Sequence, residues 1–75
     1  MTLSQEIAQK RRLLRAEYGG LMSTTDLIHE LGFSSRGATL KAARELDIPS
    51  TLISGRRRYD TDIVAQRLVE RRGMS

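Results

Sequence analysis

Residues that end helices constrain the fold most, because they divide the stretch from Thr24 to Tyr59 into short segments. Gly32 follows one apolar-periodic segment, and Ile48-Pro49 follows the next. Glycine is common just after a helix, and proline disfavours helical geometry in the residue before it. The stretch therefore predicts two short helices joined by a tight turn, one over residues 25–31 and one from the Ser34-Ser35 turn to about residue 47.

The second of these helices is expected to present small and basic side chains outward. Helical spacing places Leu40, Ala43, Leu46 and Asp47 near the inner side, with Thr39 and Arg36 on its borders. The outward residues are then Gly37, Ala38, Lys41, Arg44 and Glu45. Lys41 and Arg44 can reach phosphates or base edges, or they can pair along the helix, as Lys41 can with Glu45.

A β-hairpin is predicted after the proline, and its strands are the only ones that the sequence predicts. Residues 50–54 favour a strand, and Gly55 permits a turn before Arg56, Arg57, Arg58 and Tyr59 return. Alternation places Leu52 and Ile53 on opposite faces, so only one of them is expected to point into the core. Tyr59 is expected to cover the core edge with its hydroxyl exposed, while Arg56 and Arg58 point outward.

This order of elements resembles the small winged helix-turn-helix domains of excisionases and MerR-like regulators. The resemblance runs from Thr24 to Leu68, and its motifs are Asp26 to Gly32, Ser34-Ser35-Arg36, Ile48-Pro49, Gly55 to Tyr59 and Asp62-Ile63-Val64. It implies a mainly α fold with a small β-hairpin: a winged helix-turn-helix with an extra N-terminal helix. It also implies a sequence-specific protein that binds double-stranded DNA, with a recognition helix in the major groove and the hairpin as a wing.

The extra helix is predicted from Thr2, which can form a capping box with Gln5, to Tyr18 before Gly19-Gly20. Its basic flank consists of Lys10, Arg11, Arg12 and Arg15. The helix can pack on its own core, pair with a second subunit or lie along phosphates. We expect its apolar stripe to mediate self-association as a homodimer or on DNA; the alternative is a monomer that binds tandem sites. The stripe is Leu3, Ile7, Leu14 and Tyr18.

The chain is accordingly divided into an amphipathic basic helix over residues 1–20 and a DNA-binding domain over residues 21–75. Within the second part, Leu21 and Met22 are expected to bury at the entrance to the first short helix, which Ser23 or Thr24 caps. Asp60 or Thr61 is expected to cap a last helix, whose inner face is supplied by Ile63, Val64, Leu68 and Val69. Seventy-five residues lie near the lower limit for a self-sufficient core.

Charge placement favours DNA as the partner. The net charge is +4, and the three hairpin arginines have no acidic neighbour before Asp60. Ser34 and Ser35 can bring the N-terminal end of the second short helix to a phosphate. The residues expected to contact DNA are Ser34, Ser35, Arg36, Lys41, Arg44, Arg56, Arg57 and Arg58.

Other classes of function are disfavoured. The chain has no cysteine and one histidine, and it lacks a nucleophile–base pair or an acidic cluster, so we expect no enzyme, metal site, cofactor or small-molecule ligand. No membrane-spanning run or signal peptide is found, so a cytoplasmic, nucleoid-associated protein is expected. Within the DNA-binding class, a transcriptional regulator and an excisionase-type recombination directionality factor both fit. Outside it, the alternative is a protein-docking module that uses the N-terminal helix.

Overall fold

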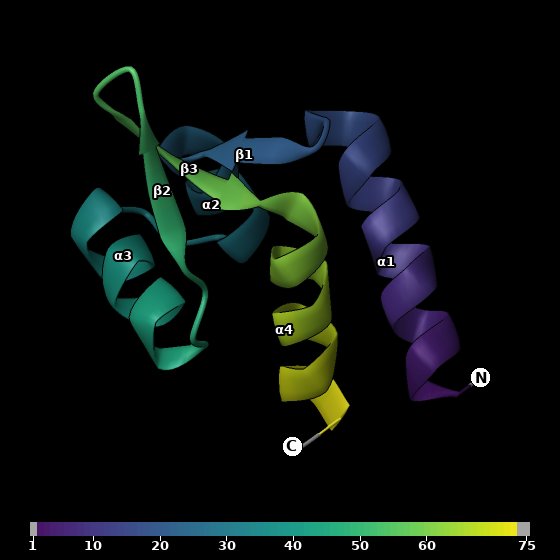
Figure 1. The fold of residues 1–75 in the computed structure, drawn as a ribbon. Coiled ribbons are helices and arrows are strands. Elements are labelled where there is room, and N and C mark those ends of the chain that lie inside the picture. Colours follow the sequence, from purple (N-terminus) through teal and green to yellow (C-terminus); the bar gives the residue numbers. More distant parts are fainter. Residues whose placement is uncertain (1, 74–75) are drawn as a thin grey trace.

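The computed structural model describes the backbone of residues 2–73 and the side chains of residues 2–71 (Figure 1). This part of the chain is mainly helical, with a small antiparallel sheet. Its elements in order are α1 (Leu3–Tyr18), β1 (Leu21–Ser23), α2 (Thr24–Leu31), α3 (Arg36–Glu45), β2 (Ser50–Ile53), β3 (Arg56–Asp60) and α4 (Thr61–Gly73). No helix within residues 2–73 is long and apolar enough to cross a membrane.

Side-chain caps begin the helices where the sequence predicts them. The Thr2–Gln5 capping box starts α1, and a second box between Ser23 and Asp26 starts α2. Ser35 accepts a hydrogen bond from the N–H of Ala38 at 3.1 Å and caps α3. Asp60 accepts from the first backbone N–H groups of α4, and this confirms it as the cap of that helix.

The sheet has three strands in the order β1–β3–β2, and both pairings are antiparallel. The sequence predicts only the β2–β3 hairpin, so β1 is an addition. Met22 of β1 and Ser50 of β2 are both registered with Tyr59. Leu21 was expected to bury with Met22, but Leu21 lies exposed on the edge strand while Met22 is fully buried. Backbone pairing with β3 therefore turns Leu21 away from the core.

One hydrophobic core joins all four helices to the sheet. Its buried residues are Leu14, Met22, Leu27, Ala43, Ile48, Tyr59, Val64 and Ala65. Helix α1 packs along α4, as Figure 1 shows. The hydroxyl of Thr61 donates to the carbonyl of Gly19 at 2.8 Å, so the Gly19-Gly20 break is fixed to the start of α4. The predicted division of the chain at residue 20 therefore separates α1 from elements with which it shares one hydrophobic core.

Two side-chain expectations for α3 are wrong. Thr39 was placed on a border but is fully buried, where its hydroxyl donates to the carbonyl of Ser35 at 2.9 Å. Asp47 was placed on the inner side but is exposed, because the chain leaves the helix there. Ala42 joins Ala43 on the buried side. Small residues at these positions let α3 lie close to the neighbouring elements.

Asp47 ends α3 in a left-handed backbone conformation, with φ of 59°. The N–H of Ile48 donates to Ala43 O, and that of Asp47 to Arg44 O, which is the Schellman pattern. Glycine adopts this conformation without a steric penalty. We expect Asp47→Gly to raise the free energy of unfolding by up to about 1 kcal/mol, measured by urea denaturation.

The control for this change is Glu45→Gly, in the last helical turn of α3. There the backbone is helical, so glycine is expected to lower the free energy of unfolding by about 1 kcal/mol. A destabilising effect at both positions would mean that the left-handed residue is not strained.

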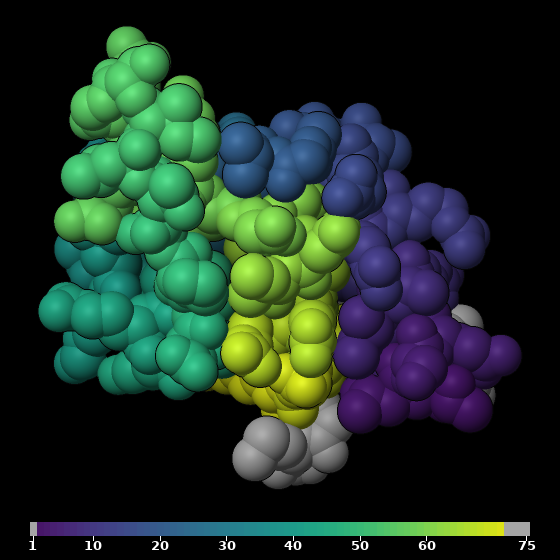
Figure 2. Space-filling view, viewed as in Figure 1, coloured from purple at the N-terminus to yellow at the C-terminus, as the bar shows by residue number. Residues whose placement is uncertain are grey.

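The hairpin extends past the core (Figures 1 and 2). Ser54 and Gly55 at its turn both have positive φ, of 53° and 78°, as in a type I′ turn. Neither Leu52 nor Ile53 reaches the core, contrary to the expectation that one would, because no helix underlies this end of β2. The hydroxyl of Tyr59, expected to be exposed, is buried and finds no hydrogen-bond partner among the described residues.

Candidate nucleic-acid interface

The basic residues divide into two groups by their partners. In the first group, ion pairs tie α1 to the rest of the domain. Lys10 Nζ lies 2.9 Å from Glu30 Oε1 of α2, and the Tyr18 hydroxyl donates to the other oxygen of the same carboxylate at 3.2 Å. Burial, followed by the charge of Glu30, raises the pKa of Tyr18 to about 12. Arg67 also has an acidic partner, but its pair with Glu70, at 3.2 Å, lies within α4. Much of the basic flank of α1 is therefore structural.

Arg15 belongs to the same group and holds Asp62 through two hydrogen bonds. Its Nε donates to Oδ1 at 2.7 Å and its Nη2 to Oδ2 at 2.8 Å. These hydrogen bonds outweigh the effect of burial and hold the pKa of Asp62 below its ordinary value. The stabilisation is therefore present above the ordinary aspartate pKa and is lost as pH falls through the lowered value.

This ion pair gives a pH prediction. An NMR titration is expected to find the pKa of the Asp62 carboxyl below its ordinary value, and Arg15→Gln is expected to raise it. Arg12→Gln serves as the control, because Arg12 lies on the same helix and forms no salt bridge among the described residues. An equal response to both substitutions would show that general charge, rather than this pair, sets the Asp62 pKa.

The second group of basic residues has no acidic partner. None of its members forms a salt bridge with any carboxylate that the structure describes. Arg57 instead donates to Ser50 Oγ at 2.8 Å, and Arg58 donates to the carbonyl of Arg57 at 3.3 Å. On α3 and the hairpin the group comprises Arg36, Lys41, Arg44, Arg56, Arg57 and Arg58, and elsewhere it includes Arg12 of α1 and Arg71 of α4. These charges are compensated only by solvent, so they are free to bind an anion.

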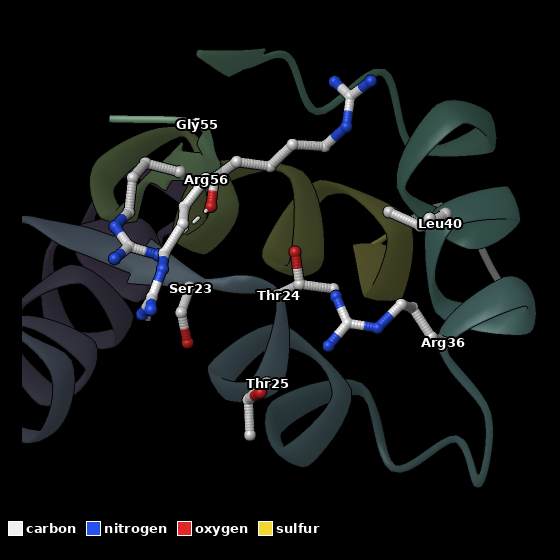
Figure 3. A pocket seen from close by; sticks show the side chains of 9 residues that line it. Ser23, Thr24, Thr25, Arg36, Leu40, Gly55 and Arg56 are labelled. Carbon is white, nitrogen blue, oxygen red and sulfur yellow. Dashed lines mark hydrogen bonds between the residues drawn. The ribbon is translucent and has the colours of Figure 1, made fainter. Parts of the chain in front are cut away.

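Four of these arginines line one groove, which we call the arginine groove (Figure 3). Its volume is about 500 Å³, and it lies between the hairpin and the N-terminal ends of α2 and α3. Figure 3 shows Arg36 extending from α3 towards Thr24. Its lining holds no acidic residue and consists of Ser23, Thr24, Thr25, Arg36, Leu40, Gly55, Arg56, Arg57 and Arg58. The positive ends of two helix dipoles add to the arginine charges.

A second hollow, of about 280 Å³, lies between α3 and the core side of the hairpin. Arg57 borders both hollows, because it shares a sheet face with Tyr59 and so overhangs α3. Arg44 borders only this second hollow. The two hollows together present α3 and the hairpin as one basic surface.

The structure brings together part of the predicted DNA-contact set. Arg36 and the three hairpin arginines line the groove, and Arg44 lines the neighbouring hollow. Lys41 is exposed on α3 but lines neither hollow, while Ser34 is exposed in the turn and Ser35 serves as a cap. Thr24 and Thr25, in the first turn of α2, also line the groove, and neither belongs to the predicted DNA-contact set.

The predicted self-association stripe is largely committed to the domain itself. Leu14 is 2% exposed in the core, and Tyr18 packs against that core. Ile7 is half-buried, and only Leu3 is exposed. The exposed leucine next along α1 is Leu13, which lies outside the stripe. These side chains therefore do not form a continuous free surface for a second copy.

Comparisons with known proteins provide no evidence on the function of this chain. No protein-family model, no curated protein and no solved structure matches the chain. A function for the chain therefore rests on its fold and on the arginine groove.

Proposed function

We propose that this chain is a winged helix-turn-helix protein that binds double-stranded DNA. In this proposal α2 and α3 form the helix-turn-helix, α3 enters the major groove, and the β2–β3 hairpin is the wing. The major groove of B-DNA is wide enough for an α-helix, and α3 carries small residues at its exposed start, Gly37 and Ala38. A wing beside such a helix reaches the flanking backbone or minor groove.

The observation that carries the proposal is the arginine groove. Arg36, Arg56, Arg57 and Arg58 all line it although no described carboxylate pairs with them. Bringing four positive charges together raises the free energy of the folded chain unless an anion neutralises them. A duplex supplies phosphates at regular spacing, and guanidinium groups match phosphate oxygens in geometry. By contrast, the basic residues of α1 that pair with Glu30 and Asp62 are explained without a ligand.

Salt dependence provides the direct test. Binding to fluorescent duplexes of random and genomic sequence is measured by polarisation over a range of salt concentrations. If the protein binds duplex DNA, the logarithm of the binding constant falls linearly with that of salt, by about 0.9 for each phosphate contacted. Absence of binding at low salt, or binding that is insensitive to salt, would contradict the proposal. A protein-docking module that uses apolar side chains of α1 gives the former result, because it does not bind the duplex.

The outward side of α3 is predicted to read sequence. Lys41→Ala and Arg44→Ala are expected to weaken binding to a selected site more than binding to random DNA. A bidentate contact from a basic side chain to guanine contributes about 1–3 kcal/mol of discrimination. The control is Arg71→Ala on α4, an exposed arginine that lines neither of the two hollows beside α3. Equal losses on both kinds of DNA would make Lys41 and Arg44 phosphate contacts and assign specificity to DNA shape.

A further inference from the structure

The end of the hairpin carries two apolar side chains that the fold does not use. Leu52 is 64% exposed and Ile53 44% exposed, immediately before the Ser54-Gly55 turn. The hairpin projects beyond the helices, so these side chains meet no core (Figure 2). The high strand propensity of isoleucine explains an exposed isoleucine at position 53. It does not explain an exposed leucine at position 52, because leucine is not among the strand-favouring residues. Leu52 is the most exposed large apolar side chain among the described residues, so it is available to a partner outside the domain.

Each of these apolar residues lies directly across from an arginine. The register pairs Leu52 with Arg57 and Ile53 with Arg56. Residues paired across antiparallel strands project from the same face, so Ile53 shares one face of the tip with Arg56, and Leu52 shares the other with Arg57, whose guanidinium group reaches back along the hairpin to Ser50. A molecule that binds the hairpin tip must therefore carry negative charge close to an apolar surface.

Duplex DNA meets this requirement better than a protein surface or a second copy of the chain. A partner protein that covered Leu52 and Ile53 would also desolvate Arg56 and Arg57, which requires carboxylates to compensate. A second copy of the hairpin would bring more arginines instead. In DNA, phosphates border each groove, and the apolar faces of the bases are stacked between them.

We propose that Leu52 and Ile53 form a wedge that enters a groove of the bound duplex and partly unstacks one base step. This inference rests on the proposed DNA-binding function and adds a mode of contact to it. Arg56 holds a flanking phosphate while an apolar side chain enters between bases, as apolar wedges do in minor-groove binding proteins. Pyrimidine–purine steps such as TA unstack most readily, so they are the preferred points of entry.

Fluorescence of 2-aminopurine tests the wedge directly, because this base brightens when it unstacks. It is placed in turn beside each TA step of a short duplex, and the full chain is added to saturation at low salt. The parent protein is expected to increase the fluorescence at one or more positions. Leu52→Thr/Ile53→Thr is expected to abolish that increase while still binding the duplex, since threonine keeps strand propensity and the arginines are untouched.

The matched control is Leu3→Thr/Leu13→Thr, which removes two comparably exposed leucines from α1 and is expected to keep the increase. Thermal unfolding verifies the fold of both double variants, and the single Leu52→Thr variant replaces the hairpin pair if that pair unfolds. The wedge is refuted if the bound parent brightens no position, or if the hairpin variant brightens the duplex as much as the parent does.

Two further outcomes concern the partner itself, which the wedge and the proposed function share. A parent chain that binds no duplex at any salt concentration refutes the DNA-binding function and the wedge with it. Vesicles containing phosphatidylglycerol provide the other comparison, because an anionic membrane also combines charge with an apolar interior. Binding to these vesicles that exceeds duplex binding and depends on Leu52 and Ile53 would overturn the wedge.

Discussion

Replacing Arg36, Arg56 and Arg57 together by glutamine is expected to weaken duplex binding at every sequence and to flatten its salt dependence. Each phosphate contact that is lost lowers the magnitude of the slope by about 0.9. Glutamine keeps the polar end and most of the side-chain length, so the change removes mainly charge. Arg58 is retained in this variant, because it is half-buried and donates to the carbonyl of Arg57.

The matched control removes the same amount of charge elsewhere. Arg11, Arg12 and Arg71 are exposed on α1 and α4, and none of them lines the arginine groove. Their combined replacement by glutamine leaves the same net charge as the groove variant. We expect the control to bind with nearly the parent slope, measured by polarisation over the same salt series. Equal losses in both variants would show that total charge, and not the groove, drives association.

Helix boundaries are the part of this fold that the sequence predicts well. Each boundary depends on a residue and its near neighbours, as in the capping boxes of Thr2–Gln5 and Ser23–Asp26. Gly32 ends α2 in a left-handed conformation, as expected of a glycine at that position. Asp60 caps α4 for an equally local reason.

Strand β1 is not predictable in the same way, because its partner is distant in sequence. Only three residues long, it is defined by pairing with β3, where Leu21 is registered with Asp60. A run of three residues carries no periodicity that distinguishes a strand from an extended loop. The exposure of Leu52 and Ile53 is likewise a tertiary property, since alternation alone cannot show where the core ends.

The sequence predicts which types of residue form the candidate site, but it does not predict how these residues are arranged. Clustered arginines at the hairpin point to an anion, whereas the sequence cannot show which basic residues already have partners. Arg15 pairs with Asp62 and Lys10 with Glu30, across 47 and 20 residues of chain. The local pair that helical spacing suggests, Lys41 with Glu45, is not among the salt bridges of the described residues. Tertiary ion pairs therefore decide which charges remain available.

Replacing Leu14 by alanine is expected to destabilise the whole domain, because α1 is part of its core. Leu14 is 2% exposed and belongs to the core cluster, which also includes residues from every other helix and from the sheet. Truncating a buried leucine to alanine costs about 2–5 kcal/mol, depending on how far the cavity collapses. In a domain of this size, where 1 kcal/mol shifts the melting temperature by roughly 4–8 °C, the loss is on the order of 10 °C or more.

Leu13→Ala is the matched control, since it makes the same chemical change one residue away. Leu13 is 59% exposed, so its replacement is expected to alter the free energy of unfolding by no more than about 0.5 kcal/mol. Both variants are measured by thermal and urea denaturation of the full chain. If instead Leu13→Ala weakened self-association and Leu14→Ala left stability unchanged, α1 would be a docking helix rather than part of the core. The expected result assigns Leu14 of the apolar stripe to folding rather than to pairing with a second subunit.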